Sequence, residues 1–413
     1  MLSRNDFENL PVFMTSMSRW DGVVSSASIS LAKVFCRTND VYYIDYPYSW
    51  ADMIRERKLA SVEKRLPALL WGKKNLLHLK EQPGNLMAIT PKAVLPIFSL
   101  PEGLIYDKAS HYNNKLVAGL VKRIAQQQKI SNYIFINSFN PVYLSAIDRY
   151  LSPVLSIYHS RDAIEEVEGH GLRKENECVK AYDMVMATSK QLCRNISDRN
   201  GKTVHYFPNG GDVQLFKTAL EQKLSKPKEL ENITTPIIGY TGALAQREDY
   251  ALIEKIAKAN PDKTIVFVGP RNDKEFTNIN LDAIPNILFT GAKKINELPA
   301  YLQHFDCAII PFLKNNLTGG IYPLKINEYL AAGKAVITTD FSEDINSFKD
   351  HISIAVTHDD FLKAIAPAIA NNSVEKKQER LTVALSNSWE KRVQQFWNIA
   401  WEAYQQKSVH QKK

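Results

Sequence analysis

Cysteine is scarce in this chain of 413 residues, which contains four of them, far apart from one another. Cys36, Cys178, Cys193 and Cys307 form no CxxC pair and have no histidine partner at metal-ligand spacing. This pattern excludes the disulfide-rich secreted class and argues against a structural zinc site. We expect these residues to be core thiols of a reducing compartment.

Long apolar runs are also missing. No run reaches the ~18 residues that a membrane-spanning helix needs. The first residues lack the basic stretch and long apolar core of a signal peptide. We therefore expect a cytoplasmic protein.

Negative charge is in the minority, since the formal net charge is +8 and the pI is near 9.0. Such a balance favours acidic partners. The sequence has no zinc finger, no RNP-type aromatic motif and no long basic tail, so we expect no nucleic-acid partner.

An anionic membrane surface is another possible acidic partner. The window Arg55–Lys80 places many lysines and arginines beside leucines and Trp71, a mixture that suits a segment lying on lipid headgroups. The alternative is a packed helix with a solvated basic face.

The first half of the chain alternates β-prone apolar runs with helical patterns, which predicts a parallel sheet covered on both faces. A polar stretch, 217–234, follows and is typical of a linker. A second alternating series then begins, so the length of the chain is best explained by two doubly wound α/β domains. We predict an N-terminal domain at 1–216, a C-terminal domain at 235–385 and a terminal helix at 386–413. The predicted strands are Pro11–Thr15, Val41–Asp45, Leu86–Thr90, Tyr133–Asn137, Val154–Tyr158, Met184–Ala187, Thr203–Phe207, Pro236–Tyr240, Thr264–Val268, Asn286–Phe289, Cys307–Pro311, Ala335–Thr339 and Ile352–Val356.

The terminal helix carries one apolar stripe at helical period. Three tryptophans on one face suit either docking onto the protein itself or contact with a membrane or partner. The stripe consists of Trp389, Val393, Phe396, Trp397, Ala400, Trp401 and Tyr404.

The most informative stretch is Thr318–Asp340, with the sequence TGGIYPLKINEYLAAGKAVITTD. It predicts a small-residue loop with exposed N–H groups at Gly319 and Gly320, a helix from Leu324 to Ala332, and a buried strand. A helix N-terminus after a glycine loop attracts anions, and Lys325 adds a positive charge there. Glu328 follows at a distance that suits a ribose, whose hydroxyls a carboxylate can accept. The stretch therefore indicates a site for a nucleoside diphosphate.

The same residues resemble the donor-binding segment of GT-B-fold glycosyltransferases, in particular the retaining family-4 enzymes. In that family the glutamate matching Glu328 holds the ribose of a sugar nucleotide, so the resemblance implies this role here. Many members have another glutamate eight positions earlier, near the donor sugar, where this chain has Gly320. The resemblance also implies two Rossmann-like domains facing a cleft, with a terminal helix crossing back to the N-terminal domain.

Further residues follow predicted strands, where a doubly wound sheet presents its ligands. Gly242 allows close approach of a phosphate, and Arg247 can bind phosphate oxygens bidentately, although each also suits an ordinary loop. Arg271 follows the next strand, in a segment that resembles the base-side loop of the family. Ser189, at a predicted helix N-cap, and the turn Phe207–Asp212 resemble two further landmarks.

In the first half, His159 is predicted to end a strand, where family-4 enzymes often have a histidine near the donor sugar. Asp162 could orient His159 or act as a base toward the acceptor hydroxyl. Asp21 and Gly22 fall in the first strand–helix loop, which in GT-B enzymes touches phosphate or acceptor. For Asp21, helix capping is the alternative.

Together with these features, the resemblance implies a hexosyltransferase-type enzyme of surface polysaccharide biosynthesis. It would move a sugar from a nucleotide-diphosphate sugar to a hydroxyl of a glycan or lipid-linked acceptor. Lys325, with Arg247, would stabilise the leaving diphosphate, so no metal and no resident cofactor are expected. The resemblance implies retention at the anomeric carbon. A sugar-nucleotide epimerase and a non-catalytic partner subunit of the same fold are alternatives.

Overall fold

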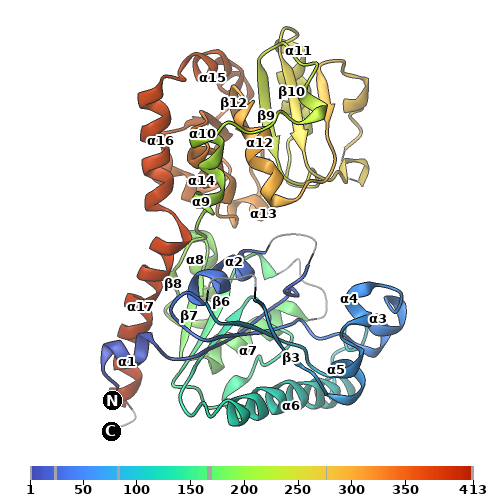
Figure 1. The fold of residues 1–413 in the computed structure, drawn as a ribbon, viewed down its shortest axis with the longest axis vertical. Coiled ribbons are helices and arrows are strands. Elements are labelled where there is room, and N and C mark those ends of the chain that lie inside the picture. The colour runs from blue at the N-terminus through green and yellow to red at the C-terminus, as the bar shows by residue number, and fades with distance from the viewer. Residues whose placement is uncertain (1, 23–25, 81–83, 165–169, 276, 411–413) are drawn as a thin grey trace. The chain divides into compact units, whose positions relative to one another are not determined.

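The computed structural model describes residues 2–22, 26–80, 84–164, 170–275 and 277–410. The chain forms two compact units (Figure 1). The N-terminal unit comprises Met1–Pro208 and Val393–Lys413, and the C-terminal unit comprises Asn209–Arg392. Each unit is described by itself below.

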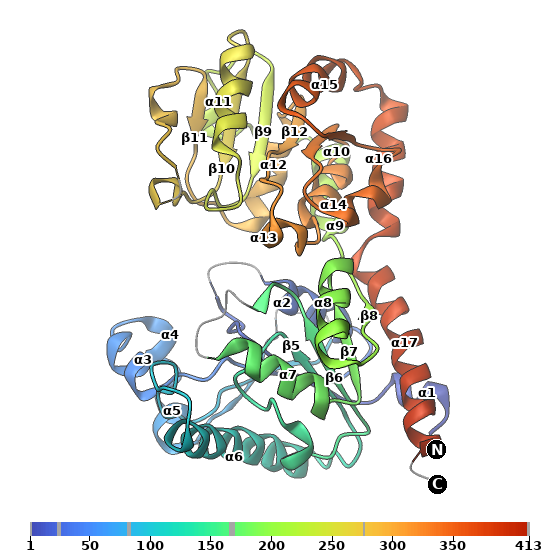
Figure 2. The same cartoon turned by 180° about the vertical axis from the view of Figure 1, so that it is seen from behind.

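The N-terminal unit is built on an eight-stranded sheet of order β3-β4-β2-β1-β5-β6-β7-β8. Strand β3 is antiparallel to β4, and the other pairs are parallel. Helix α2 lies on one face of this sheet and α7 on the other (Figures 1 and 2). The strands are β1 (Val12–Ser16), β2 (Val41–Ile44), β3 (Leu76–His78), β4 (Leu86–Ile89), β5 (Ile134–Ser138), β6 (Leu155–Ser160), β7 (Met184–Ala187) and β8 (His205–Tyr206). The helices are α1 (Arg4–Glu8), α2 (Ala27–Phe35), α3 (Trp50–Arg55), α4 (Ala60–Glu63), α5 (Leu66–Trp71), α6 (Leu104–Gln127), α7 (Gly171–Ala181), α8 (Lys190–Asn200) and most of α17 (Trp389–His410).

The C-terminal unit is built on a six-stranded parallel sheet of order β11-β10-β9-β12-β13-β14. Its strands are β9 (Ile237–Thr241), β10 (Thr264–Val268), β11 (Ile287–Phe289), β12 (Cys307–Ile310), β13 (Val336–Thr339) and β14 (Ser353–Ala355). Its helices are α9 (Val213–Phe216), α10 (Thr218–Glu221), α11 (Tyr250–Ala259), α12 (Leu298–Gln303), α13 (Asn316–Gly319), α14 (Leu324–Ala331), α15 (His358–Ala370) and α16 (Val374–Ser386).

All predicted strands are present, and most of them are apolar runs that the sheets bury, whereas β8 and β11 at sheet edges are half-buried or exposed. In β1, for example, every residue is buried, as expected for a strand with helices on both faces. Strand β3 was not predicted, since it is three residues long and only half-buried or exposed. Helix α2 begins at Ala27, after its N-cap Ser26, and residues 23–25 lie outside the described residues.

The stretch 217–234 is not the linker that its polar composition predicted. It contains α10 and a 3₁₀ turn, and Ala219 and Leu230 belong to the core of the C-terminal unit. Val213 and Phe216, assigned to the first domain from sequence, also lie in that core. These segments are too short for a helical period to be visible in the sequence.

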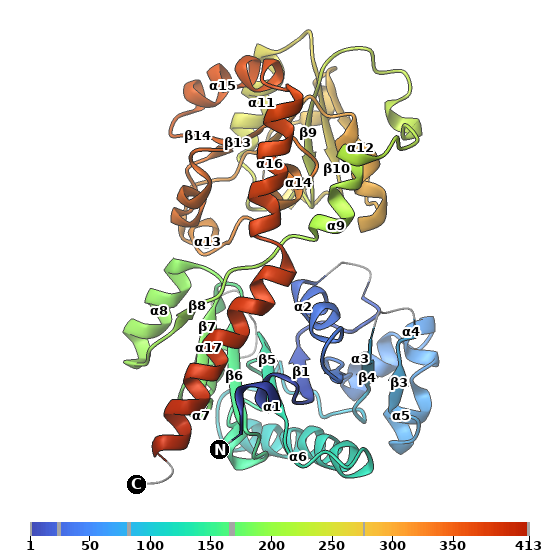
Figure 3. The ribbon, with the colours of Figure 1, turned by 60° about the vertical axis from the view of Figure 1, so that its left-hand side comes forward.

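The terminal helix α17 packs on the N-terminal unit, as predicted (Figure 3). The contact is made by its aromatic stripe. The ring centroid of Phe7 lies 6.0 Å from that of Trp397 and 4.9 Å from that of Tyr404. The ring centroids of Phe35 and Phe396 are 4.9 Å apart. Of the seven stripe residues only Trp401 is not fully buried. The stripe is therefore an internal contact. The last three residues of the predicted segment, 411–413, lie outside the described residues.

Candidate functional site

The candidate site lies at the carboxyl ends of β9, β10 and β12 in the C-terminal unit. Backbone hydrogen bonds join the three loops that follow these strands. Leu244 N–H donates to Pro270 O at 2.9 Å, and Leu313 N–H donates to Arg247 O at 2.8 Å. This edge of a doubly wound sheet is the one that presents ligand-binding groups.

Two residues predicted from sequence meet at this edge. The side chain of Lys325, on the first turn of α14, lies against Gly242, in the loop after β9. A Cβ atom built on Gly242 would lie 2.5 Å from Lys325 Cε and 2.9 Å from its Nζ. Gly242 also has φ of +136°, which L side chains rarely adopt. The glycine is thus required both by the backbone conformation and by the space that Lys325 fills.

The Lys325 ammonium is held among aromatic rings. Its Nζ lies 5.4 Å from the ring centroids of both Tyr240 and Phe312, within the range of a cation–π contact. Burial and the nearby Arg247 lower the pKa of Lys325, whereas Glu248 and Glu328 oppose this shift. The ammonium makes no hydrogen bond or ion pair with any described residue. It is a cation held in place without a carboxylate partner.

Glu328 lies three residues beyond Lys325 on the same face of α14. Among the described residues its carboxyl group also has no hydrogen-bond or ion-pair partner. Burial raises the pKa of Glu328 to about 7; Asp212 adds to the shift and Lys325 opposes it. The site therefore offers an ammonium and a carboxyl group one helical turn apart, both available to a ligand.

The predicted open loop before α14 is wrong. Thr318 and Gly319 belong to the short helix α13, capped by Asn315, and Gly320 ends it in a right-handed conformation. The N–H groups of Thr318, Gly319 and Gly320 donate to Asn315 Oδ1, Asn315 O and Leu317 O, at 3.0, 2.9 and 3.3 Å. Both glycines are buried. Because these donors are used inside the helix, Gly319 and Gly320 do not present the exposed N–H groups expected of them.

The helix and strand that follow agree with the prediction. Helix α14 ends one residue before Ala332, and Gly333 has φ of +70°, as expected at the C′ position. The buried strand β13 comes next.

Three supporting residues were not singled out from sequence. Tyr240 donates its hydroxyl to Glu248 Oε1 at 2.7 Å, and Glu248 Oε2 accepts from Ala245 N–H at 2.7 Å. Tyr329 accepts from the Thr241 N–H at 2.8 Å. These bonds fix the loop that carries Gly242 and the ring beneath Lys325. The sequence did offer one signal for Glu248, because an acidic residue is unexpected in a loop that is predicted to bind phosphate.

Arg247 is half-buried and contributes positive potential at Lys325, whose pKa it lowers. Arg271 is engaged elsewhere. It pairs with Asp273 and with Asp282, the latter at 2.7 Å, and its guanidinium lies 3.7 Å from the Phe289 ring centroid. In this structure Arg271 thus stabilises the loop after β10 through its ion pairs.

In the N-terminal unit, His159 lies inside β6 and not just past its end, because this strand continues to Ser160. Its ring is 1% exposed, and its Nε2 lies 3.3 Å from Phe207 O. Burial lowers the pKa of His159 well below its usual value, so the imidazole is neutral. Asp162, by contrast, is exposed. A catalytic role for His159 or Asp162 stays a prediction, and the burial of His159 disfavours it.

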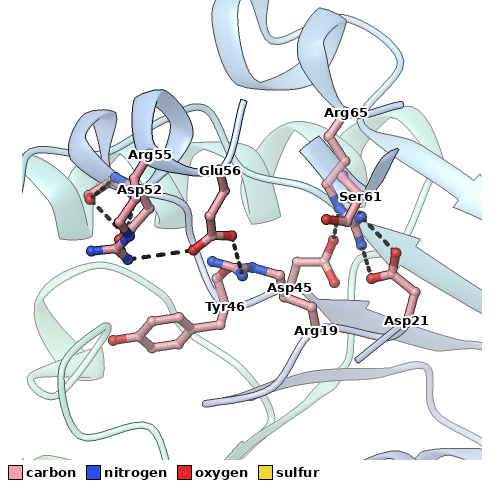
Figure 4. A network of polar contacts seen from close by, with 10 residues as sticks. Arg19, Asp21, Asp45, Tyr46, Asp52, Arg55, Glu56, Ser61 and Arg65 are labelled. Atoms are coloured by element: carbon pink, nitrogen blue, oxygen red, sulfur yellow. Dashed lines mark hydrogen bonds and ion pairs between the residues drawn. The ribbon is translucent and has the colours of Figure 1, made fainter. Parts of the chain in front are cut away.

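Asp21 is not a helix cap, because Ser26 caps α2. Its carboxylate instead accepts two hydrogen bonds from Arg65, at 2.6 and 3.0 Å (Figure 4). It also pairs with Lys64. Burial opposes ionisation, but these two cations hold the pKa of Asp21 at about 2. Gly22 is exposed, and its N–H donates to Arg19 O at 3.0 Å in a turn. Asp21 is thus engaged in an ion-pair network.

The other two landmarks are structural. Ser189 caps α8, as predicted, by accepting from Leu192 N–H at 3.1 Å. Gly210 packs so closely that an added Cβ would lie 2.6 Å from Trp389 N, and Asp212 caps α9. This turn begins the C-terminal unit.

One mostly parallel and one parallel sheet, with helices on both faces, define a pair of Rossmann-like units. Known structures share this plan along almost the whole chain. Anabaena HepE in complex with UDP and glucose is 14% identical, with a TM-score of 0.62 over 95% of this chain and 99% of that chain. An alpha,alpha-trehalose-phosphate synthase (UDP-forming) from Burkholderia vietnamiensis is 11% identical, with a TM-score of 0.64 over 96% and 98%. The chain therefore has the GT-B fold.

Sequence comparison identifies the domain that carries the candidate site. Residues 235–372 match the family described as Glycosyl transferases group 1, so the C-terminal unit contains a domain of that family. A relative in Bacillus subtilis (strain 168), named as a teichuronic acid biosynthesis glycosyltransferase, TuaH, is 26% identical over 228 residues. That match covers 52% of this chain and 56% of the relative. The chain thus matches little more than half the length of this relative.

The described part of the chain holds no group of three or more His, Cys, Asp or Glu side chains arranged to bind a metal ion. It also contains no helix with the length and hydropathy needed to cross a membrane.

Proposed function

We propose that this protein is a glycosyltransferase that uses a nucleoside-diphosphate sugar as donor. The observation that carries the proposal is the contact between Lys325 and Gly242, with Glu328 one turn further along α14. A diphosphate can approach the glycine loop and pair with Lys325 and Arg247. The ribose hydroxyls can donate to the Glu328 carboxylate. The group 1 domain and the fold shared with structures that contain UDP support this donor class.

In the proposed reaction, the bond between the anomeric carbon and the diphosphate oxygen breaks. A new bond forms between that carbon and the oxygen of an acceptor hydroxyl, whose proton passes to the leaving diphosphate. Lys325 and Arg247 stabilise the negative charge that develops on the leaving diphosphate. Because these cations supply that stabilisation, we propose that the reaction needs no metal ion and no resident cofactor. Retention at the anomeric carbon is proposed from the resemblance to family-4 enzymes.

We propose a glycan or lipid-linked sugar as acceptor and surface polysaccharide biosynthesis as the process. The name of the Bacillus subtilis relative, which refers to teichuronic acid, supports this choice. A cytoplasmic location is proposed because all four cysteines are thiols.

The test is release of nucleoside diphosphate from UDP-, GDP- and ADP-sugars by the full chain, with a panel of glycan acceptors. One donor should be turned over by the wild type, and Lys325→Ala should lower kcat by about 10²- to 10³-fold. Lys258→Ala, on the exposed face of α11, is the control and should retain full activity. Equal activity of Lys325→Ala and wild type would contradict the proposed site.

A further inference from the structure

The N-terminal unit carries an exposed apolar and basic surface that the donor site does not explain. It is formed by three short helices, α3, α4 and α5, which lie together beside β3 (Figures 1 and 3). Five large apolar side chains on these helices and their connections are exposed. They are Trp50 at 41%, Ile54 at 57%, Leu59 at 52%, Leu66 at 37% and Trp71 at 70%.

Some of the cations in this segment are used inside the protein. Arg65 is 4% exposed and donates to Asp45 Oδ2 at 2.9 Å as well as to Asp21 (Figure 4). Arg55 pairs with Asp52 at 2.6 Å, and Arg19 pairs with Glu56 at 3.8 Å. This network ties the three helices to the loops after β1 and β2, so the surface above it is held in a fixed conformation.

Other cations have no such partner. Five of them are exposed and form no hydrogen bond or ion pair with any residue in the described parts of the chain: Arg57, Lys58, Lys73, Lys74 and Lys92. Lys92 lies beside the end of α5, since a Cβ built on Gly72 would lie 2.6 Å from its Cε. It therefore adds to the charge of Lys73 and Lys74 near Trp71. Three carboxylates lie between residues 50 and 74. Asp52 and Glu56 form ion pairs, so Glu63 is the one that could offset the charge of these cations.

We propose that this surface docks on an anionic lipid membrane. Unpaired lysines and arginines suit phosphate headgroups, and exposed Trp and aliphatic side chains suit the boundary between headgroups and hydrocarbon. An acidic protein or polysaccharide would use the cations but leave the five exposed apolar side chains without a partner. An apolar protein partner would leave five cations unneutralised. The inference does not depend on the donor site, which lies in the other unit.

The experiment is flotation of the full chain with vesicles of phosphatidylcholine alone or of phosphatidylcholine with phosphatidylglycerol. The wild type should bind the anionic vesicles, bind the neutral ones at least tenfold more weakly, and dissociate as salt is raised. Each cation removed weakens binding about fivefold, so Lys73→Ala/Lys74→Ala should weaken it about 25-fold. Trp71→Ala should weaken it roughly tenfold.

The control Lys115→Ala/Lys122→Ala removes the same charge from exposed positions on α6 of the same unit and should bind as wild type does. Thermal melting checks that all variants fold. The proposal is overturned if the wild type does not float with anionic vesicles, or if the α6 control loses as much binding as Lys73→Ala/Lys74→Ala. It is also overturned if Trp71→Ala binds unchanged while soluble polyglutamate competes fully, because an acidic macromolecule would then be the partner.

Discussion

The Lys325 side chain occupies the space that a Cβ atom of Gly242 would fill, with 2.5 Å between that position and Lys325 Cε. The position of Lys325 on α14 therefore requires a glycine at position 242, in the loop after β9. The glycine permits the lysine to reach the edge of the sheet, and the lysine gives the glycine loop its positive charge.

Gly242→Ala should displace Lys325, because the flexible end of the lysine can move whereas the backbone cannot. We expect nucleotide affinity to fall at least tenfold in calorimetric titration, with a smaller loss of thermal stability from the strained φ of +136°. Gly119→Ala on α6, where an added Cβ meets nothing within 4 Å, should leave affinity unchanged and stabilise the fold by about 0.5–1 kcal/mol. Unchanged affinity in Gly242→Ala would argue against this contact as part of the donor site.

Glu328 should make both stability and binding depend on pH. Its pKa is raised from 4.5 to about 7 in the folded chain. Its stabilising contribution is therefore complete below 4.5 and is lost as the pH rises through about 7. Comparing thermal melts with Glu328→Gln, we expect the wild type to lose stability relative to the variant over that range. A constant difference between the two proteins would show that Glu328 has an ordinary pKa.

Nucleotide binding should change in the opposite direction, since only the ionised carboxylate accepts from both ribose hydroxyls. Wild-type affinity should rise by up to about tenfold per pH unit below the pKa of Glu328 and level off above it. Glu328→Gln should bind more weakly and lack this part of the pH profile. Titrations at several pH values measure it, and a profile shared by both proteins would assign the dependence to the phosphate instead.

Glu248 should act as a positioning residue for Lys325. It accepts from Tyr240 at 2.7 Å and favours the charged form of the lysine. Glu248→Gln keeps one acceptor oxygen for the Tyr240 hydroxyl but loses the charge and the bond from Ala245 N–H. We expect diphosphate affinity in this variant to decline at a lower pH than in the wild type as Lys325 loses its proton. If Glu248→Gln binds the diphosphate as the wild type does at neutral pH, the variant is folded and the effect is electrostatic. If its affinity falls at the same alkaline pH as that of the wild type, the role of Glu248 is contradicted.

Arg65 should be important for folding. Replacing it with alanine leaves Asp45, 1% exposed, without its ion-pair partner. Such a loss costs about 3–5 kcal/mol, so the N-terminal unit should melt markedly earlier in calorimetry. Arg57→Ala, an exposed and unpaired control, should change stability by less than about 0.5 kcal/mol. Equal melting of the two variants would show that the network is dispensable.

Local patterns explain which features the sequence predicts well. The strands are continuous apolar runs, Ser189 is followed by a helical pattern, and Gly333 follows the last periodic residue of α14. Each of these depends on neighbouring residues alone.

The errors come from partners that are distant in sequence or compete locally. Asp21 is a residue type that often caps helices, but its carboxylate accepts hydrogen bonds from Arg65, 44 residues later in the chain. Thr318–Gly320 has the composition of an open loop, but Asn315 caps it as a helix. His159 has the spacing of a strand end, but pairing with β7 extends the strand to Ser160.

The most direct test of the donor site is calorimetric titration of UDP, GDP, ADP and CMP into the wild type and Lys325→Ala, with and without EDTA. We expect one nucleoside diphosphate to bind the wild type equally well in EDTA and to bind Lys325→Ala at least tenfold more weakly. Absence of binding by every nucleotide to the wild type, or equal binding to both proteins, would contradict the proposed site and favour a non-catalytic role for the fold.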